Sequence, residues 1–429
     1  MTWWESMRSS ILSPGPPLVF DGAMGTELYA RGLERGGIPS RYSREHPEIV
    51  ADVHRAYLEA GAAILTTNSF NTPALAISDP AEARELVTAA VELARRLADS
   101  SGRNVGVACD LGPTARLLEP LGELPFETAV TIYRDLAAAG QAAGADLILI
   151  ETMTDTYELK AAIVGAREGA TLPIFATWSP DSSGRLLTGA DLETTAAIVE
   201  GLGVAALGIN CATGPAEIAP QIARLARATA LPLIARPNAG VPHGGDSDDA
   251  YLDPGSFRAE MAGLLGAGVR FVGGCCGTNP AHIRELAGLA AASHTGLSDV
   301  GERAIATSQR RVFYPGDVTY QIGARLVSDD PVGEALDQLD EGCDFIAVPA
   351  DPELVAELEP LVNAPLVIVG DDPVLLEATL RLVRGRPLVQ VSGPEAYPAA
   401  ATVAGRYGAA VRVPGEASHK IHIPKGVQR

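Results

Sequence analysis

The chain has 429 residues, 47% of them hydrophobic and 20% charged, a composition typical of a globular protein rather than a disordered or fibrous one. Its formal net charge of −20 argues against nucleic acid as a partner, because phosphate binding needs a basic surface, and it disfavours acidic membranes for the same reason. The opening sequence MTWWESMRSSILSPGPP lacks the apolar core of a signal peptide, and no uncharged apolar run reaches about 18 residues, so we expect a cytoplasmic protein without a membrane partner.

From residue 18 to about residue 290, short apolar runs alternate with longer Ala- and Leu-rich amphipathic stretches, which predicts βα units and a parallel sheet. One example of a helix is 46–61, where Pro47 suits the first turn and Gly61 suits the C-cap. Eight strands are expected, which is the number that closes a (β/α)8 TIM barrel; a doubly wound open sheet is the alternative. The expected strands are 18–22, 62–70, 104–112, 146–152, 173–179, 205–211, 231–238 and 269–276.

Unusual polar residues fall at the carboxyl ends of these strands, and in a barrel such ends meet at one mouth, where active sites of this architecture lie. These residues are Asp21, Thr67, Asn68, Asp110, Glu151, Thr177, Asn210, Cys211, Asn238, Cys275 and Cys276.

The sequence GGCCGT after the eighth strand places two thiols side by side, although neighbouring residues of a regular strand point to opposite faces. We expect Gly273, Gly274 and Gly277 to supply the departure from strand geometry through positive φ angles. Cys211 ends the sixth strand, so that its thiol can meet Cys275 and Cys276 across the mouth. Three thiolates without a fourth cysteine indicate a Zn²⁺ site with one position open for a substrate thiol.

Two other interpretations of the cysteines stay open. The Cys275–Cys276 pair could be a small buried filler, since free cysteine is among the most buried residue types. The pair could also form a strained vicinal disulfide and act as a redox switch. Cys109 and Cys343 lie inside apolar runs and are expected in the core.

Four segments, DGAMGTEL, TNSFNT, GINC and GGCCGTNPAHI, resemble the homocysteine S-methyltransferase family over residues 18–290. The family includes the homocysteine module of cobalamin-dependent methionine synthase and the betaine- and S-methylmethionine-dependent enzymes. The resemblance implies zinc-dependent transfer of a methyl group to the thiol of homocysteine, forming methionine, with Cys211, Cys275 and Cys276 as the zinc ligands.

The resemblance also implies a pocket for the amino-acid end of homocysteine. Asp21 and Glu151 would hold its amino and carboxylate groups, with backbone amides near Gly22 and in the TNSF loop, which contains Thr67 and Asn68. Asn210 completes the expected substrate-binding set.

Simpler roles are open for several of these residues. Asp21 could cap a turn, and Asp110 and Asp146 could be ordinary turn residues. Thr67, Asn68 and Asn238 could line the pocket or satisfy loop backbone. Only three of the 33 basic residues are lysine, so a single arginine carries little information.

The sequence specifies the methyl acceptor better than the donor, which could be S-methylmethionine, betaine, methyltetrahydrofolate or a methylcobalamin protein. The chain contains no D-x-H-x-x-G cobalamin motif. The alternative function is therefore a zinc- and homocysteine-binding subunit that is active only with a separate cobalamin or methyl-donor protein.

The expected domains are a homocysteine-binding zinc barrel at 1–295, a linker at 296–312, an α/β segment at 313–415 and a tail at 416–429. The α/β segment resembles the opening half of a pterin-binding barrel, but Ala324, Val327, Val369 and Gln390 replace polar residues that would bind the pterin. We expect this segment to pack on the barrel or to make a homo-oligomer contact.

Overall fold

The structure is a computed structural model that describes residues 2–34, 36–240, 251–297, 300, 304–314 and 320–413; the expected tail at 416–429 lies outside these ranges. The chain forms two compact units. The first combines Met1–Leu187 with Val204–Asp299, and the second combines Thr188–Gly203 with Val300–Arg429.

The first unit is built around eight parallel strands in the order β1-β8-β7-β6-β5-β4-β3-β2. A parallel bridge between Phe20 and Ile64 joins the two ends of this sheet, so the predicted (β/α)8 TIM barrel is confirmed. The strands are β1 (Leu18–Val19), β2 (Ile64–Thr66), β3 (Gly106–Leu111), β4 (Leu147–Met153), β5 (Ile174–Trp178), β6 (Ala206–Cys211), β7 (Leu233–Pro237) and β8 (Val269–Val272).

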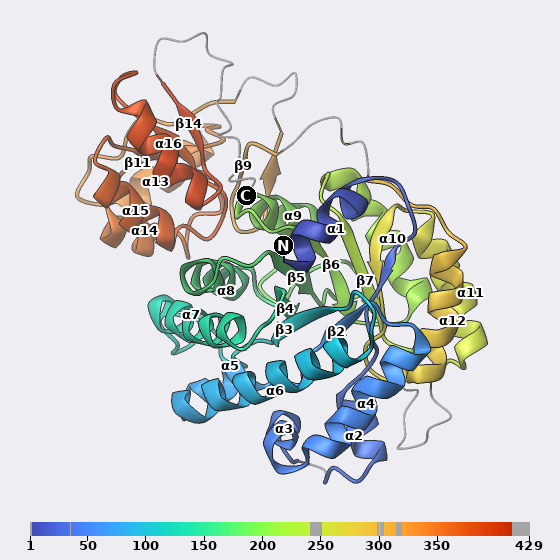
Figure 1. The fold of residues 1–429 in the computed structure, drawn as a ribbon. Helices are drawn as coiled ribbons and strands as arrows, with labels where there is room; N and C mark the ends of the chain where they lie inside the picture. The colour runs from blue at the N-terminus through green and yellow to red at the C-terminus, as the bar shows by residue number, and fades with distance from the viewer. Residues whose placement is uncertain are drawn as a thin grey trace. The chain divides into compact units, whose positions relative to one another are not determined.

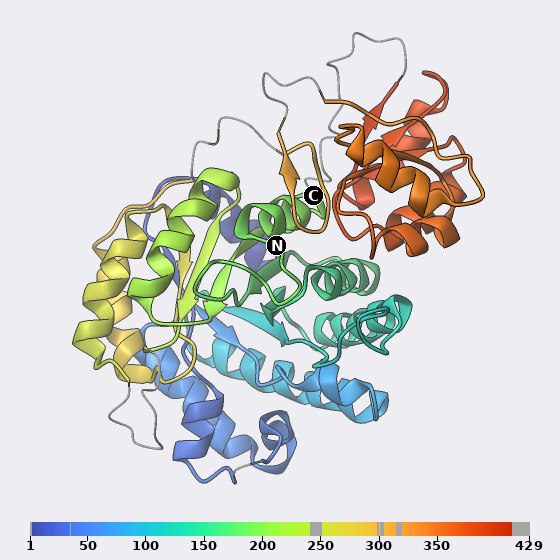
Figure 2. The ribbon, with the colours of Figure 1, turned by 180° about the vertical axis from the view of Figure 1, so that it is seen from behind.

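Helices surround these strands (Figures 1 and 2). In α4 the predicted signals act as expected, because Pro47 opens the helix and Gly61 ends it with φ 105°. The helical segments are α1 (Trp3–Leu12), α2 (Gly25–Ala30), η1 (Pro39–Arg41), α3 (Tyr42–Glu45), α4 (Pro47–Ala60), α5 (Thr72–Ala76), α6 (Pro80–Ser100), α7 (Phe126–Ala142), α8 (Thr156–Gly169), α10 (Pro215–Ala228), α11 (Pro254–Leu265) and α12 (Pro280–Ala291).

Helix α1 was not predicted, and it packs into the barrel core. A capping box between Thr2 and Glu5 starts the helix, and its Trp3 and Ile11 belong to the same buried cluster as interior residues of the strands. Arg270 on β8 donates to the carbonyl oxygens of Ser10, Ile11, Gly15 and Thr295 at 2.6–3.0 Å. This arginine therefore joins the last turn of α1 and the segment after it to the segment that follows α12.

The second unit contains a four-stranded parallel sheet in the order β11-β12-β13-β14 and a two-stranded antiparallel ribbon, β9-β10. The ribbon includes residues of the expected linker at 296–312. Residues from both sheets form one buried cluster, which contains Phe313, Phe345 and Val367. The elements are α9 (Leu192–Gly201), β9 (Ala306–Thr307), β10 (Val312–Phe313), α13 (Pro331–Asp340), β11 (Ile346–Pro349), α14 (Pro352–Leu358), β12 (Leu366–Val369), α15 (Pro373–Leu382), β13 (Leu388–Gln390), α16 (Tyr397–Arg406) and β14 (Ala410–Arg412).

Among the described residues, no helix combines the length and the apolar character that crossing a bilayer requires.

Candidate metal centre and substrate pocket

The structure brings the three predicted cysteines together at the mouth of the barrel. The sulfur atoms of Cys211, Cys275 and Cys276 all lie within 4.8 Å of one another. Zn–S bonds of about 2.3 Å in a tetrahedron place sulfur atoms about 3.8 Å apart, so this donor set fits a zinc ion with small adjustments. Cys276 is exposed, whereas Cys211 and Cys275 are partly buried, so the centre is accessible from outside.

The backbone that presents these thiols departs from strand geometry at specific residues. Cys211 and Ala212 have φ angles of 59° and 54°, a left-handed conformation that non-glycine residues rarely adopt. On the other side, the Cys275 amide donates to the carbonyl of Pro237 at 2.8 Å. The end of β7 therefore supports the cysteine pair.

The prediction that three glycines supply positive φ angles holds only for Gly277, at 78°. It is wrong for Gly273 and Gly274, which are required for close packing instead. A Cβ on Gly273 would lie 2.8 Å from the Cβ of Phe20, and one on Gly274 would lie 2.3 Å from Thr278 Oγ1. Neither position has room for a larger residue.

The pKa values of the three thiols depend on one another. Hydrogen bonds from Cys275 and Cys276 lower the pKa of the Cys211 thiol to about 3. The same hydrogen bonds with Cys211 raise the pKa of Cys275 to about 11 and raise that of Cys276. The lowered pKa of Cys211 favours its thiolate form, which is the form that binds a metal cation.

A layer of buried charge lies beside the cysteines. Glu151 on β4 and Asp21 after β1 are both buried, and Arg236 on β7 is only 4% exposed. Arg236 Nη1 donates to Glu151 Oε2 at 2.7 Å, and its Nη2 lies 3.6 Å from Asp21 Oδ1. Burial raises the pKa of Asp21 to about 6, although Arg236 and hydrogen bonds from Thr66 oppose this rise.

Asp110, at the end of β3, is a third carboxyl group of this layer and is 3% exposed. Burial, followed by the charge of Glu151, raises its pKa well above the ordinary value. Burial also raises the pKa of Glu151, although the charge of Arg236 opposes this rise. The turn role considered for Asp110 does not describe this buried position.

Asn210 is fully buried, and its side chain bonds within the protein. Its Oδ1 accepts from the Thr152 amide and from Thr177 Oγ1, both at 2.8 Å, and its Nδ2 donates to Thr152 Oγ1 at 2.7 Å. The register of β4 and β5 shifts between Ile150 and Met153, a bulge, and Thr152 has φ 61°. Asn210 thus holds the bulge that contains Glu151 and Thr152.

The predicted residues of the TNSF loop are also bonded internally. Thr67 Oγ1 lies 2.7 Å from Ser69 Oγ and accepts from the Asp110 amide at 3.0 Å. Asn68 Nδ2 donates to the carbonyl of Pro39 at 2.7 Å and to Ser43 Oγ at 3.1 Å. These two side chains hold the loop in place.

Gly22 has no room for a side chain, because a Cβ would lie 2.7 Å from Thr278 Oγ1 and 2.8 Å from Tyr57 Oη. Thr278 Oγ1 accepts from the Ala23 amide at 3.1 Å and donates to the carbonyl of Cys275 at 2.7 Å. The DG turn is therefore packed directly against the cysteine segment.

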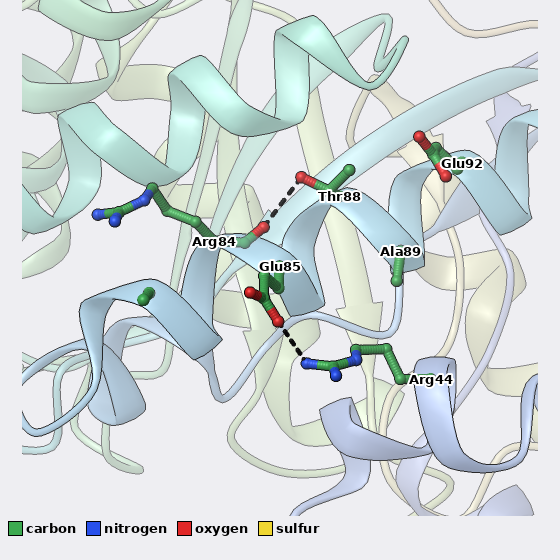
Figure 3. Close-up of a pocket in the computed structure, with 7 residues that line it drawn as sticks. Arg44, Arg84, Glu85, Thr88, Ala89 and Glu92 are labelled. Atoms are coloured by element: carbon green, nitrogen blue, oxygen red, sulfur yellow. Dashed lines mark hydrogen bonds and ion pairs between the residues drawn. The ribbon is translucent and has the colours of Figure 1, made fainter.

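A surface pocket between α3 and α6 is separate from this centre (Figure 3). It is lined by Arg44, Ala81, Arg84, Glu85, Thr88, Ala89 and Glu92. Arg44 Nη1 pairs with Glu85 Oε2 at 2.6 Å, and Thr88 Oγ1 donates to the Arg84 carbonyl at 3.0 Å. None of the three cysteines lines it, so we do not assign the chemistry to this pocket.

The chain is thus a TIM barrel that carries, at its mouth, three convergent thiols able to hold a metal ion and a set of buried carboxyl groups. The sequence pattern of the homocysteine S-methyltransferase family matches residues 18–290. The chain belongs to this family.

Two curated relatives are methionine synthases. The protein from Mycobacterium tuberculosis is 38% identical over 291 residues, which are 63% of this chain and 24% of the relative. The protein from Mycobacterium leprae is 36% identical over 307 residues, 67% of this chain and 25% of the relative. The chain thus spans about a quarter of the length of these relatives.

Solved structures of homocysteine methyltransferase MmuM from Escherichia coli are also similar. The metallated form aligns with a TM-score of 0.55 and 26% identity, covering 67% of this chain and 99% of that protein. The apo form aligns with a TM-score of 0.51 and 28% identity, covering 64% of this chain and 96% of that protein.

The sequence did not single out Arg236. It placed Asp110 at the mouth of the barrel, with a turn residue as the simpler alternative, and gave it no substrate-binding role. Arg236 stands in LIARPN, an apolar strand sequence, and a charged residue inside such a run is either paired or functional. That signal was obscured because arginine supplies nearly all of the chain's positive charge.

Proposed function

We propose that the chain transfers a methyl group to the thiol of homocysteine and so forms methionine, with one zinc ion held by Cys211, Cys275 and Cys276. The observation that carries this proposal is the cluster of three cysteine sulfurs within 4.8 Å at the mouth of the barrel, beside buried carboxyl groups. When bound there, zinc would supply stabilisation of a thiolate at neutral pH.

In the proposed reaction the sulfur of homocysteine attacks the methyl carbon in line with the bond to the donor. The new S–CH₃ bond forms as the methyl–donor bond breaks, and the bonding electron pair leaves with the donor. The thiol proton is lost to solvent before the attack. The protein then has to hold the thiolate and the amino-acid end in one orientation rather than transfer a proton.

We assign the amino-acid end to the residues beside the cysteines. Asp21 and Glu151 supply carboxylates for the ammonium group, since an ammonium in a partly dry pocket requires such a partner. Backbone groups near Gly22 border the same pocket. Thr67, Asn68 and Asn210 shape it through the internal hydrogen bonds described above.

Two measurements test the proposal. Metal analysis of the reduced, purified protein is expected to give about one zinc per chain. Assays with homocysteine and each of S-methylmethionine, betaine, methyltetrahydrofolate and methylcobalamin are expected to show turnover with one free donor. A fully active metal-free protein would contradict the proposed mechanism.

A second candidate is a zinc- and homocysteine-binding subunit that works with a separate cobalamin or methyl-donor protein. The lengths of the two proteins favour this candidate. The region that matches this chain makes up only 24% of the M. tuberculosis methionine synthase, so that relative has further parts with no counterpart in the aligned region. Turnover that begins only when a second protein is added to the same donor assays would support this candidate.

A further inference from the structure

We infer that Arg236 is a positioning residue that makes the site selective for thiols carrying an α-ammonium group, with Asp110 as a third carboxyl group of the pocket. The inference rests on the proposed function and deepens it. It concerns how the amino-acid end is recognised, whereas the zinc centre concerns the sulfur.

The Arg236 guanidinium lies between two carboxylates and an aromatic ring. Arg236 Nη1 donates to Glu151 Oε2 at 2.7 Å, its Nη2 lies 3.6 Å from Asp21 Oδ1, and its Cζ lies 4.9 Å from the centroid of the Phe20 ring. Three different strand regions, β4, β1 and β7, are therefore joined by one planar guanidinium. A planar fork can hold two carboxylates in fixed directions, which a lysine ammonium does less well.

Two carboxylate oxygens beside Arg236 can accept a hydrogen bond from a further donor. Asp21 Oδ2 accepts from the Thr66 amide at 2.7 Å, but Asp21 Oδ1 and Asp110 Oδ1 are buried without a hydrogen-bond partner among the described residues. A buried oxygen without a hydrogen-bond donor is energetically unfavourable. An ammonium group offers three donors, so it would satisfy both oxygens.

The net charge of the buried groups also favours a bound cation. The pocket holds three carboxyl groups, Asp21, Asp110 and Glu151, and one buried arginine, Arg236. If one of the three carboxyl groups is protonated, the other two remain negative and only one of these charges is balanced by Arg236. The four groups together then carry one net negative charge. A bound ammonium supplies that charge, whereas without Arg236 the buried carboxyl groups would take up protons and lose their attraction for it.

The experiment compares two thiols on the zinc-loaded protein by isothermal titration: homocysteine and 4-mercaptobutanoate, which is the same chain without the amino group. The unchanged protein is expected to prefer homocysteine by about tenfold or more, the value of one charge-assisted hydrogen bond. Arg236→Met should bring the ratio close to one while zinc content and affinity for 4-mercaptobutanoate stay the same. Arg236→Lys should give an intermediate ratio, and Asp110→Asn should lower it.

Arg270→Met is the matched control. Arg270 is also a buried arginine, on the neighbouring strand β8, but its partners are backbone carbonyls and Thr295 rather than carboxylates. This variant should lower stability and leave the ratio unchanged.

If Arg236→Met prefers homocysteine over 4-mercaptobutanoate as strongly as the unchanged protein does, the inference is overturned. If Arg236→Met does not fold, the same result in Arg236→Lys overturns it. Equal affinity of the unchanged protein for both thiols also overturns it while leaving the proposed function intact. Absence of binding by either thiol would instead count against the proposed function.

Discussion

Asn210 and Thr152 form a reciprocal pair in which the Thr152 amide donates to Asn210 Oδ1 at 2.8 Å and Asn210 Nδ2 donates to Thr152 Oγ1 at 2.7 Å. Asn210 immediately precedes Cys211, and Thr152 immediately follows Glu151. The pair therefore connects the residue proposed to hold the metal to the residue proposed to hold the substrate.

Replacing Asn210 with Ala is expected to cost about 2–4 kcal/mol of unfolding free energy, because three buried hydrogen bonds are lost and the Thr152 amide is left without an acceptor. Zinc affinity should fall as well, since Cys211 loses its support. Urea denaturation and a zinc competition assay measure the two effects. Thr177→Val, which removes only one of the three hydrogen bonds, is the control, and equal losses in both variants would contradict this account.

Removing any one of the three clustered thiols is expected to remove most of the zinc and most of the activity together. Two thiolates cannot both hold the ion and leave it open to substrate in the same geometry. Metal analysis of Cys211→Ala, Cys275→Ala and Cys276→Ala checks this expectation. Cys343→Ala, a free cysteine of the second unit, should keep full zinc content.

Glu151→Gln is expected to keep the zinc but to weaken homocysteine binding by about 1.5–3 kcal/mol, the range for a hydrogen bond to a charged group. The substitution preserves shape and removes the negative charge. Asp21→Asn should act in the same direction. Titration with homocysteine, together with a zinc assay, separates this effect from loss of the metal; unchanged affinity in both variants would place the substrate elsewhere.

The preference for homocysteine over 4-mercaptobutanoate should depend on pH. The pKa of Asp21 is raised to about 6, so this group is ionised above that pH and neutral below it. A neutral Asp21 attracts ammonium weakly, and the preference should therefore fall as pH drops below about 6. Titrations with both thiols at several pH values measure this preference as a ratio of affinities, in which effects shared by both thiols cancel. In Asp21→Asn the ratio should no longer change with pH near 6.

His54 makes a separate contribution to acid sensitivity. It is buried on α4, neither ring nitrogen has a hydrogen-bond partner in the part of the chain that the structure describes, and burial lowers its pKa from 6.5 to about 4. Between these values the unfolded chain binds a proton that the folded chain does not, so stability is lost as pH falls from about 6.5 toward 4. The loss by pH 5 should be about 2 kcal/mol.

His54→Leu is expected to remove this loss. Urea denaturation at pH 7 and pH 5 on both proteins gives the comparison. A pH dependence that is identical in the two proteins would show that His54 is not the group responsible.

The barrel and its cysteines could be predicted because both depend on local patterns. Alternating apolar runs marked all eight strands, and the glycine-flanked cysteine pair marked the place where the eighth strand ends. Arg236 and Asp110 could not be assigned in this way, because each lies beside Glu151 only in the folded barrel. Asp110 does so through the pairing of β3 with β4, and Arg236 reaches Glu151 from β7, which is not a neighbour of β4 in the sheet. Glycine is required at positions 273 and 274 because Phe20 and Thr278 pack against them, not because of a backbone angle, and such a contact between distant residues could not be predicted from the local sequence.

The Arg270 contacts have a consequence for the order of folding. The guanidinium bonds to the carbonyl of Gly15, 255 residues earlier in the chain, and to Thr295, so the closing contacts of the barrel span nearly the whole first unit. Long-range closure carries an entropic cost that local contacts do not, so we expect it late in folding. Cys275 and Cys276 directly follow that last strand, so the trithiolate centre can form only as the barrel closes. Metal binding would then favour the closed ring by mass action, and a metal-free chain should open first at the seam between β1 and β8.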